Sequence, residues 1–192
     1  MYKLGFLLLC VSLQAQTEDS KFNVIHQGKI LGTLDAIKTT KENVINYQSH
    51  TNIEYDLLIA ISISYKYDVT FKDYDLNEAR AHIVVRGKDK TKVKTVKAGN
   101  SYAFYSEDEV IKTLKGPISQ SVIQLVFDEP IGVTRIYAEE HGDFHTIKKI
   151  GEHIYLKTSP NGRESTYYYK NGVLQKSDVD AGIIKFTIVR RK

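Results

Sequence analysis

The chain has 192 residues, enough for one core, and its 27 Lys and Arg residues against 23 Asp and Glu give a formal net charge of +4. So balanced a charge excludes the strong electrostatic attraction on which non-specific binding to nucleic acid or anionic lipid depends. The single cysteine, Cys10, excludes an intrachain disulfide.

The first sixteen residues are typical of a secretory signal peptide. Met1-Tyr2-Lys3 is a short positive start, and Leu4 to Leu13 is an apolar run too short to span a bilayer. Ala15 supplies the small residue for a cleavage near Ala15-Gln16. We therefore expect an exported protein, periplasmic or extracellular, with residues 1–16 as signal peptide and residues 17–192 as a single β domain. After cleavage it would keep neither cysteine nor integral membrane segment, although a retained anchor is the alternative.

Alternating apolar and polar residues predict strands through the first half of the chain. Residues 22–26 and 29–37, separated at Gly28, predict a hairpin or bulged ribbon. From Ile53 to Phe71 every odd position is apolar or aromatic, which predicts one long strand, bent near Leu58, at the centre of a curved sheet. Short connections then lead into strands near residues 79–86 and 91–97.

The stretch from Lys88 to Lys97 alternates lysine with threonine and valine. Lysines on an edge strand guard a sheet against aggregation, so this stretch predicts a solvent-facing edge strand more than a binding patch.

The middle of the chain carries two patterns that favour helix. Ser106 is followed three residues later by Glu109, a capping box, and Gly116-Pro117 would end the helix that it begins. Apolar residues then recur at helical spacing over residues 118–126. A second helical turn or two is favoured there, ending before Pro130, with a buried strand as the alternative.

From Val133 onward turn residues again separate short strands. The predicted strands are 134–139, 144–150, 152–157, 164–169 and 183–189, and Asn171-Gly172 is the strongest hairpin signal. The whole predicts a mainly β fold: a single curved antiparallel β-meander or half-open barrel of about ten strands. One or two short helical segments would pack midway on its concave face.

Several of these features together resemble an uncharacterised family of small exported all-β proteins of Bacteroidota, a domain of unknown function. They are the signal peptide, Gly28-Lys29-Ile30-Leu31-Gly32, the long alternating stretch, Pro117-Ile118 with Ser121-Val122, Phe127-Asp128-Glu129-Pro130 and Asn171-Gly172. The chain is more loosely similar to another exported family of unknown function, whose β-meander holds a short helix against its concave face. The resemblance implies export to a Gram-negative envelope and an all-β fold, and it implies no activity.

Motifs for chemistry are weak. His141, His145 and His153, with Asp143, Glu139 and Glu140 nearby, are the one metal constellation to consider. However, Gly142 places His141 in a turn while His145 begins the next strand, so a polar hairpin tip is favoured and no metal or other cofactor is expected. No G-x-S-x-G, S-x-x-K or phosphate-binding glycine loop is present, so we expect a protein that is not an enzyme.

The thirteen tyrosines and seven phenylalanines suggest a ligand site on the concave face. Candidate lining residues are Tyr55, Ile59, Ile63, Tyr67, Tyr102, Phe104, Tyr137 and Tyr155. The alternative is that most of these aromatic residues fill the core. We expect a non-catalytic exported protein that binds a lipid or another apolar small molecule. The alternatives are an envelope interaction or scaffold protein with a filled core, and a hydrolase.

Overall fold

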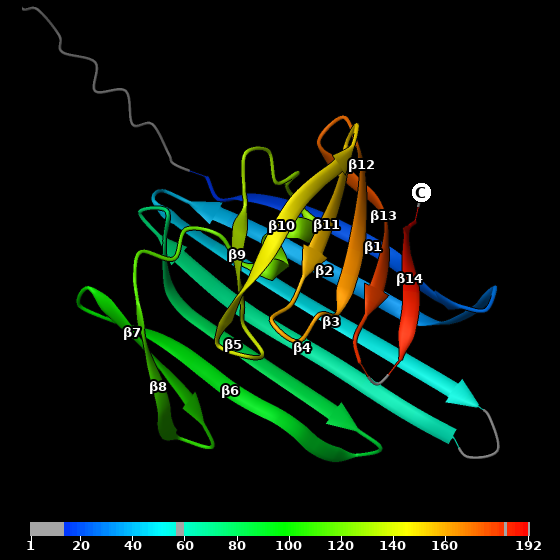
Figure 1. Ribbon diagram of the computed structural model, residues 1–192, viewed down its shortest axis with the longest axis horizontal. Coiled ribbons are helices and arrows are strands. Elements are labelled where there is room, and N and C mark those ends of the chain that lie inside the picture. The colour runs from blue at the N-terminus through cyan, green and yellow to red at the C-terminus, as the bar shows by residue number, and fades with distance from the viewer. Residues whose placement is uncertain (1–13, 57–59, 183, 192) are drawn as a thin grey trace, which may run out of the picture.

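The computed structural model describes residues 14–56, 60–182 and 184–191, and most of them belong to one antiparallel sheet (Figure 1). Its strands are β1 (Gln16–His26), β2 (Lys29–Lys41), β3 (Val44–Asp56), β4 (Ala60–Lys72), β5 (Asp75–Val85), β6 (Lys88–Ala98), β7 (Ser101–Ser106), β8 (Glu109–Lys115), β9 (Arg135–Ala138), β10 (Asp143–Gly151), β11 (Ile154–Thr158), β12 (Glu164–Lys170), β13 (Val173–Asp180) and β14 (Lys185–Arg190). The predicted open antiparallel fold is confirmed, but the described residues form fourteen strands and not about ten.

Strand β1 joins the beginning and the end of the chain, because it pairs with β2 on one side and with β14 on the other. All other neighbours in the sheet are neighbours in sequence, as short turns favour. β8 and β9 are therefore the two edges, and the described residues form no ladder between them that would close a barrel. In Figure 1, β9–β14 cross over β2–β6, so the sheet folds over and encloses an interior between its two halves.

A single turn of 3-10 helix, η1 (Val122–Val126), lies in this interior and contacts β3, β9 and β13. Its side chains Ile123 and Leu125 are buried, one in each of the two hydrophobic clusters of the core. The helical segment predicted within residues 118–126 is thus present, packed between the halves of the sheet. Just before it, Ser121 forms an isolated parallel bridge with Tyr137 of the edge strand β9.

The long strand predicted from Ile53 to Phe71 is wrong, because the chain reverses direction between Asp56 and Ala60. The two strands on either side, β3 and β4, pair antiparallel with Asp56 opposite Ala60. Odd-numbered residues therefore oppose odd-numbered residues, and Ile53 opposes Ile63 on the same face. The alternation stays in phase through the reversal, and for this reason the pattern resembles one uninterrupted strand.

The helix predicted over residues 106–115 is also wrong, since this segment forms the hairpin of β7 and β8. Glu107 and Asp108 occupy the turn with φ of 49° and 68°, in the left-handed region. Two positive φ values are what a two-residue hairpin turn requires, and the β-branched Val110 and Ile111 after it favour a strand. This hairpin also corrects the prediction for β6, which pairs with β5 and β7 and is not an edge strand.

Most of the predicted signal peptide, residues 1–13, lies outside the described residues. Among the residues that are described, no helix is long and apolar enough to cross a membrane.

Candidate functional site

The fold leaves a cavity of about 150 Å³ in the interior, beside η1. One wall comes from β2, β3 and β4, and the opposite wall from β11 to β14. Eight of its seventeen lining residues are apolar: Leu34, Val122, Ile123, Val126, Val179, Ala181, Phe186 and Ile188. We call this space the interior cavity.

A cluster of polar side chains forms one part of the cavity wall. The turn between β9 and β10 supplies Glu139 and Glu140, which face tyrosines of β4 and Lys157 of β11. Tyr67 donates a hydrogen bond from its hydroxyl to Glu140 Oε2 at 2.8 Å. Glu139 is only 3% exposed, and its Oε1 accepts the backbone N–H of Ile123 at the start of η1, at 3.0 Å.

The chain reaches this turn geometry through Gly142, whose φ is +58°. Its amide donates to Ala138 O at 3.0 Å, which closes the turn. A Cβ at this position would lie 2.5 Å from the ring of Phe104, so a larger residue fits neither the backbone nor the space. The acidic pair Glu139-Glu140 is thereby held against the interior.

Burial changes the proton affinity of several groups in the cluster. It lowers the pKa of His145 to about 4, with the neighbouring positive charge of Lys157 as a second cause, so this imidazole is neutral near pH 7. Burial likewise lowers the pKa of Lys157, although the nearby carboxylates of Glu140 and Glu139 oppose the change. The pKa of Glu139 is raised, again mainly by burial.

Two side chains at the cavity, Tyr65 and Lys157, have hydrogen-bond donors to spare. The hydroxyl of Tyr65 is buried and has no hydrogen-bond partner among the described residues. Lys157 Nζ lies 3.4 Å from His145 Nδ1, and no described carboxylate lies within ion-pair distance of it. Buried polar groups are normally satisfied, so the unpaired hydroxyl of Tyr65 at the cavity favours a ligand that brings an acceptor.

The acceptors around the cavity, in contrast, have partners. Glu140 is bound by Tyr67 and also lies 3.2 Å from His141 Nδ1. Asp180 pairs with Lys185 at 3.1 Å and accepts the amide of Gly182 at 2.9 Å. The carboxylates of Glu140 and Asp180 therefore already have donors within the protein.

A second cavity of about 140 Å³ adjoins the first and shares Glu140, Lys157, Asp180 and Ala181 with it. Exposed residues of the β11–β12 turn, Asn161 among them, also line this second cavity, so it faces the surface. Lys157 thus stands between an apolar interior space and a polar opening.

Three of the predicted concave-face residues, Tyr55, Ile63 and Tyr67, lie on β3 and β4. Tyr67 lines the interior cavity, and Ile63 is buried in the adjoining hydrophobic cluster. Tyr55 packs edge-on against His26, with ring centroids 5.2 Å apart. Ile59 lies outside the described residues.

The remaining four are buried in the core and do not line the interior cavity: Tyr102, Phe104, Tyr137 and Tyr155. The hydroxyl of each tyrosine among them has an internal partner, which fits the alternative that aromatic residues fill the core. The three pairs are Tyr102 with Asp75, Tyr137 with Thr95, and Tyr155 with Glu129.

The weak metal candidates do not converge. His141 and His145 have ring centroids 5.8 Å apart, but His153 lies elsewhere, with its Nδ1 3.0 Å from Glu129 Oε1. Among the described residues, no three His, Cys, Asp or Glu side chains are grouped as a metal site requires.

Sequence reasoning missed Tyr65 and Lys157 as site residues. The alternation of apolar and polar residues predicts that both side chains face inward. Tyr65 shares its face of β4 with Ile63 and Tyr67, and Lys157 shares its face of β11 with Tyr155. A lysine at an inward position of a strand is the kind of residue that the pattern marks as unusual.

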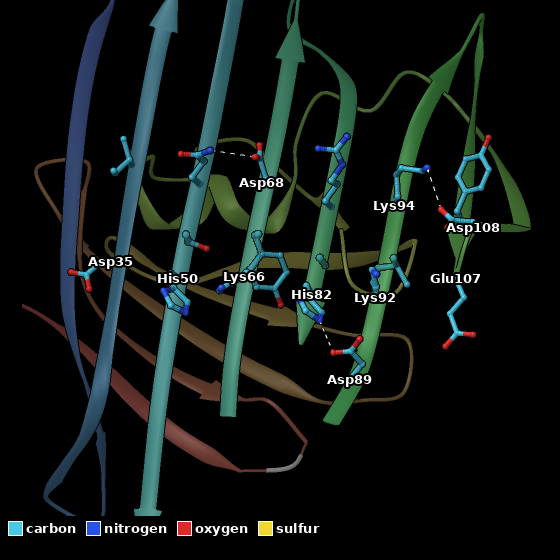
Figure 2. A pocket seen from close by; sticks show the side chains of 18 residues that line it. Asp35, His50, Lys66, Asp68, His82, Asp89, Lys92, Lys94, Glu107 and Asp108 are labelled. Atoms are coloured by element: carbon cyan, nitrogen blue, oxygen red, sulfur yellow. Dashed lines mark hydrogen bonds and ion pairs between the residues drawn. The ribbon is translucent and has the colours of Figure 1, made fainter. Parts of the chain in front are cut away.

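Another hollow lies on the other face of the sheet, and we call it the outer trough. It has a volume of about 910 Å³ and extends over β2 to β7. Figure 2 shows polar side chains standing on successive strands in this trough, with η1 behind the sheet. One row follows the strand register: Asp35, His50, Lys66, His82 and Lys92.

Comparison with known proteins places the chain in a family. Residues 22–191 match the model of the domain of unknown function DUF6134, so the chain belongs to this family. The search of curated proteins gives no match. A crystal structure described as a beta-barrel-like protein of the domain of unknown function DUF1849, from Brucella abortus, is similar over 91% of this chain and 95% of that chain, with 10% identity and a TM-score of 0.49.

Proposed function

We propose that this member of the DUF6134 family is an exported, non-catalytic protein that binds a small amphipathic molecule in its interior cavity. The observation that carries the proposal is the buried hydroxyl of Tyr65, which lines the cavity without a hydrogen-bond partner among the described residues. Lys157 adds an amine whose described hydrogen-bond partner is His145 Nδ1 at 3.4 Å, so two of its three N–H groups are free to donate to a ligand. A ligand with a carboxylate or carbonyl at one end would supply that acceptor and place its apolar part beside η1.

The size of the cavity narrows the ligand class. A protein cavity of about 150 Å³ holds a molecule such as benzene, whereas sites for larger organic ligands measure about 300–1,000 Å³. The interior cavity has this smaller size because Ile123 and Leu125 of η1 occupy much of the interior. The volume favours a small aromatic or short-chain acid over a lipid with long acyl chains.

Export is part of the proposal and has its own support. The apolar run of residues 4–13 follows a lysine and precedes Ala15, as in a secretory leader. The first strand begins at Gln16, next to the predicted cleavage near Ala15-Gln16. Expression of the full chain in a Gram-negative bacterium should yield a periplasmic or secreted product whose N-terminal sequence starts near Gln16. A product that stays in the cytoplasm with an intact N-terminus would contradict export.

The binding proposal is tested with probes of matched size and different charge. Benzoate, benzylamine and toluene share one ring, but benzoate alone offers an anionic acceptor. We expect ligand-observed NMR to show binding in the order benzoate, toluene, benzylamine. Native mass spectrometry of protein purified without denaturant would show whether a small molecule of this class copurifies.

Three variants assign the binding to this cavity. Lys157→Met removes the donor but keeps the length of the side chain, and Val126→Phe fills the cavity, so both should abolish the preference for benzoate. Lys148→Met on the exposed face of β10 is the matched control and should bind as the parent does. Equal binding of benzoate and benzylamine, or benzoate binding that survives Val126→Phe, would rule the proposal out.

A further inference from the structure

The two edges of the sheet differ in whether another segment covers them. At β9, the amide of Tyr137 donates to Gln120 O at 2.9 Å and Ser121 forms its bridge with Tyr137, so the segment before η1 lies along this edge. At β8, the described residues form a ladder with β7 on one side and none on the other. Figure 1 shows β8 at the margin of the molecule. The backbone N–H and C=O groups on its outer side are therefore open to a further strand.

The side chains of β8 leave this edge without the usual protection. Val110 and Ile111 follow one another in the strand, and each is 56% exposed. Edge strands of monomeric proteins are commonly protected by charged side chains or by a covering segment, and exposed apolar side chains there favour association. Lys112 at the middle of β8 is held by its own chain, because its ammonium lies 2.8 Å from Asp143 Oδ1 and over the ring of Phe104.

The charges of β8 are complementary to those of a second, antiparallel copy of the same strand. The strand begins with Glu109 and ends with Lys115. Both side chains are exposed, and neither forms an ion pair with a residue that the structure describes. Full antiparallel overlap of two copies brings the acidic beginning of each β8 beside the basic end of the other, once at each end of the pair. Opposite charges on neighbouring antiparallel strands stabilise the pairing.

We propose that β8 pairs antiparallel with β8 of a second copy of this chain, so that the two sheets become continuous in a symmetric dimer. The interface is isologous, because each copy supplies the same strand. None of the residues that line the interior cavity belongs to β8, so the dimer and the proposed ligand binding are tested independently.

The dimer should be weak. β8 has seven residues, and its pairing with β7 shifts register between Phe104 and Tyr105, which marks a bulge in the strand. Interfaces that bury less than about 1,200 Å² are typical of weak, transient association. We therefore expect a dissociation constant in the micromolar range.

Sedimentation-velocity ultracentrifugation of the protein from about 1 to 200 µM tests the proposal and should show a monomer–dimer equilibrium. The double variant V110K/I111K places charge on the open edge and should weaken the dimer about tenfold or more. Its matched control is I131K/I150K, which adds the same charge at two exposed apolar residues outside β8 and should dimerise as the parent does. Thermal unfolding of both variants should match the parent, because all four side chains are exposed.

Charge reversal tests the antiparallel arrangement itself. E109K and K115E each place like charges beside one another at both ends of the pair, so each should weaken the dimer about threefold to tenfold. The double variant E109K/K115E exchanges the two charges and should restore the affinity of the parent. Such restoration is specific to an interface in which these two residues meet across the copies.

Several results would overturn the proposal. A protein that sediments as a monomer at every concentration would do so, and so would a dimer that V110K/I111K and I131K/I150K weaken equally. A dimer that neither single charge reversal weakens, or whose affinity E109K/K115E does not restore, would exclude antiparallel pairing of β8.

Discussion

The interior of this protein has two regions that both contain buried tyrosines but differ in whether the tyrosine hydroxyls have hydrogen-bond partners. In the packed region, the hydroxyls of Tyr102, Tyr137 and Tyr169 each have an internal partner: Asp75, Thr95 and the carbonyl of Leu125. In the interior cavity, the hydroxyl of Tyr65 has none among the described residues. The burial of a tyrosine therefore does not by itself identify a ligand site. The informative observation is whether its hydroxyl has a hydrogen-bond partner within the protein.

The same difference extends to charge. In the packed region, Glu129 has both Tyr155 and His153 within hydrogen-bond distance, which contributes to a lowered pKa although its burial acts the other way. Beside the cavity, burial shifts the pKa of Glu139 upward and that of Lys157 downward, so each is less readily charged than in water. Glu129 thus has partners that favour its charged form, whereas burial makes the charged forms of Glu139 and Lys157 costly. An anionic ligand of the proposed kind would offset this cost for Lys157 only.

The largest expected effect comes from emptying the packed region. Tyr137→Ala removes a fully buried ring and should lower the free energy of unfolding by about 3–5 kcal/mol. Tyr74→Ala, at a tyrosine that is 83% exposed, should change it by less than about 0.5 kcal/mol. Urea denaturation of both variants checks the contrast. Similar losses for the two would mean that the region around Tyr137 is not packed as described.

The pH dependence of the free energy of unfolding should reveal the lowered pKa of His145, which lies beside Lys157 at the cavity. The pKa of His145 is lowered from 6.5 to about 4 in the folded protein, so folding favours its neutral form. The contribution of neutral His145 to the free energy of unfolding is fully present above pH 6.5 and is lost as the pH falls toward 4. At most about 3 kcal/mol is at stake.

Denaturation of the parent and of His145→Gln at a series of pH values isolates this contribution. The difference in unfolding free energy between them should be constant above pH 7 and shrink between pH 6.5 and 4. A difference that does not vary with pH would show that His145 has an ordinary pKa in the folded state.

A pair of hydroxyl deletions compares the two regions directly. Tyr137→Phe leaves Thr95 Oγ1, which is fully buried, without its partner at 2.6 Å, and should cost about 1–3 kcal/mol. Tyr65→Phe removes a hydroxyl that has no protein partner among the described residues, so stability should change by less than about 0.5 kcal/mol or rise. Urea denaturation measures both, and equal losses would show that the Tyr65 hydroxyl is satisfied in the folded protein.

Turn chemistry made most of the fold predictable from sequence. Asn171-Gly172, with φ of 52° and 77°, joins β12 to β13 as a two-residue turn should. The reversal at Asp56–Ala60 has no such marker, and its register keeps odd residues on one face, so periodicity alone could not reveal it. Turn residues such as glycine and asparagine predict a hairpin from the local sequence. Where such residues are absent and the apolar alternation continues in phase, the local sequence does not predict the reversal.

The site was less predictable, because it is assembled from segments far apart in the chain. Tyr65 of β4 and Lys157 of β11 line one cavity only because β1 pairs with β14 and brings the two halves face to face. Alternation places each side chain on the inward face, but nothing local states which inward residues meet. The lysines of β6 show the same limit, since the strand was expected at an edge and in fact stands between two others, beside the trough.

The smallest expected effect concerns the β7–β8 hairpin, which carries Tyr102 of the packed region. Glu107 and Asp108 hold positive φ values, a conformation that asparagine and glycine adopt at lower cost. The double variant Glu107→Asn, Asp108→Gly should therefore raise the free energy of unfolding by about 0.5–1 kcal/mol. In a helix the same glycine would cost about 1 kcal/mol, so the sign of the change measured by urea denaturation separates a hairpin from the helix that the capping box predicts. A loss of stability would contradict the β7–β8 hairpin, on which the position of Tyr102 in the packed region depends.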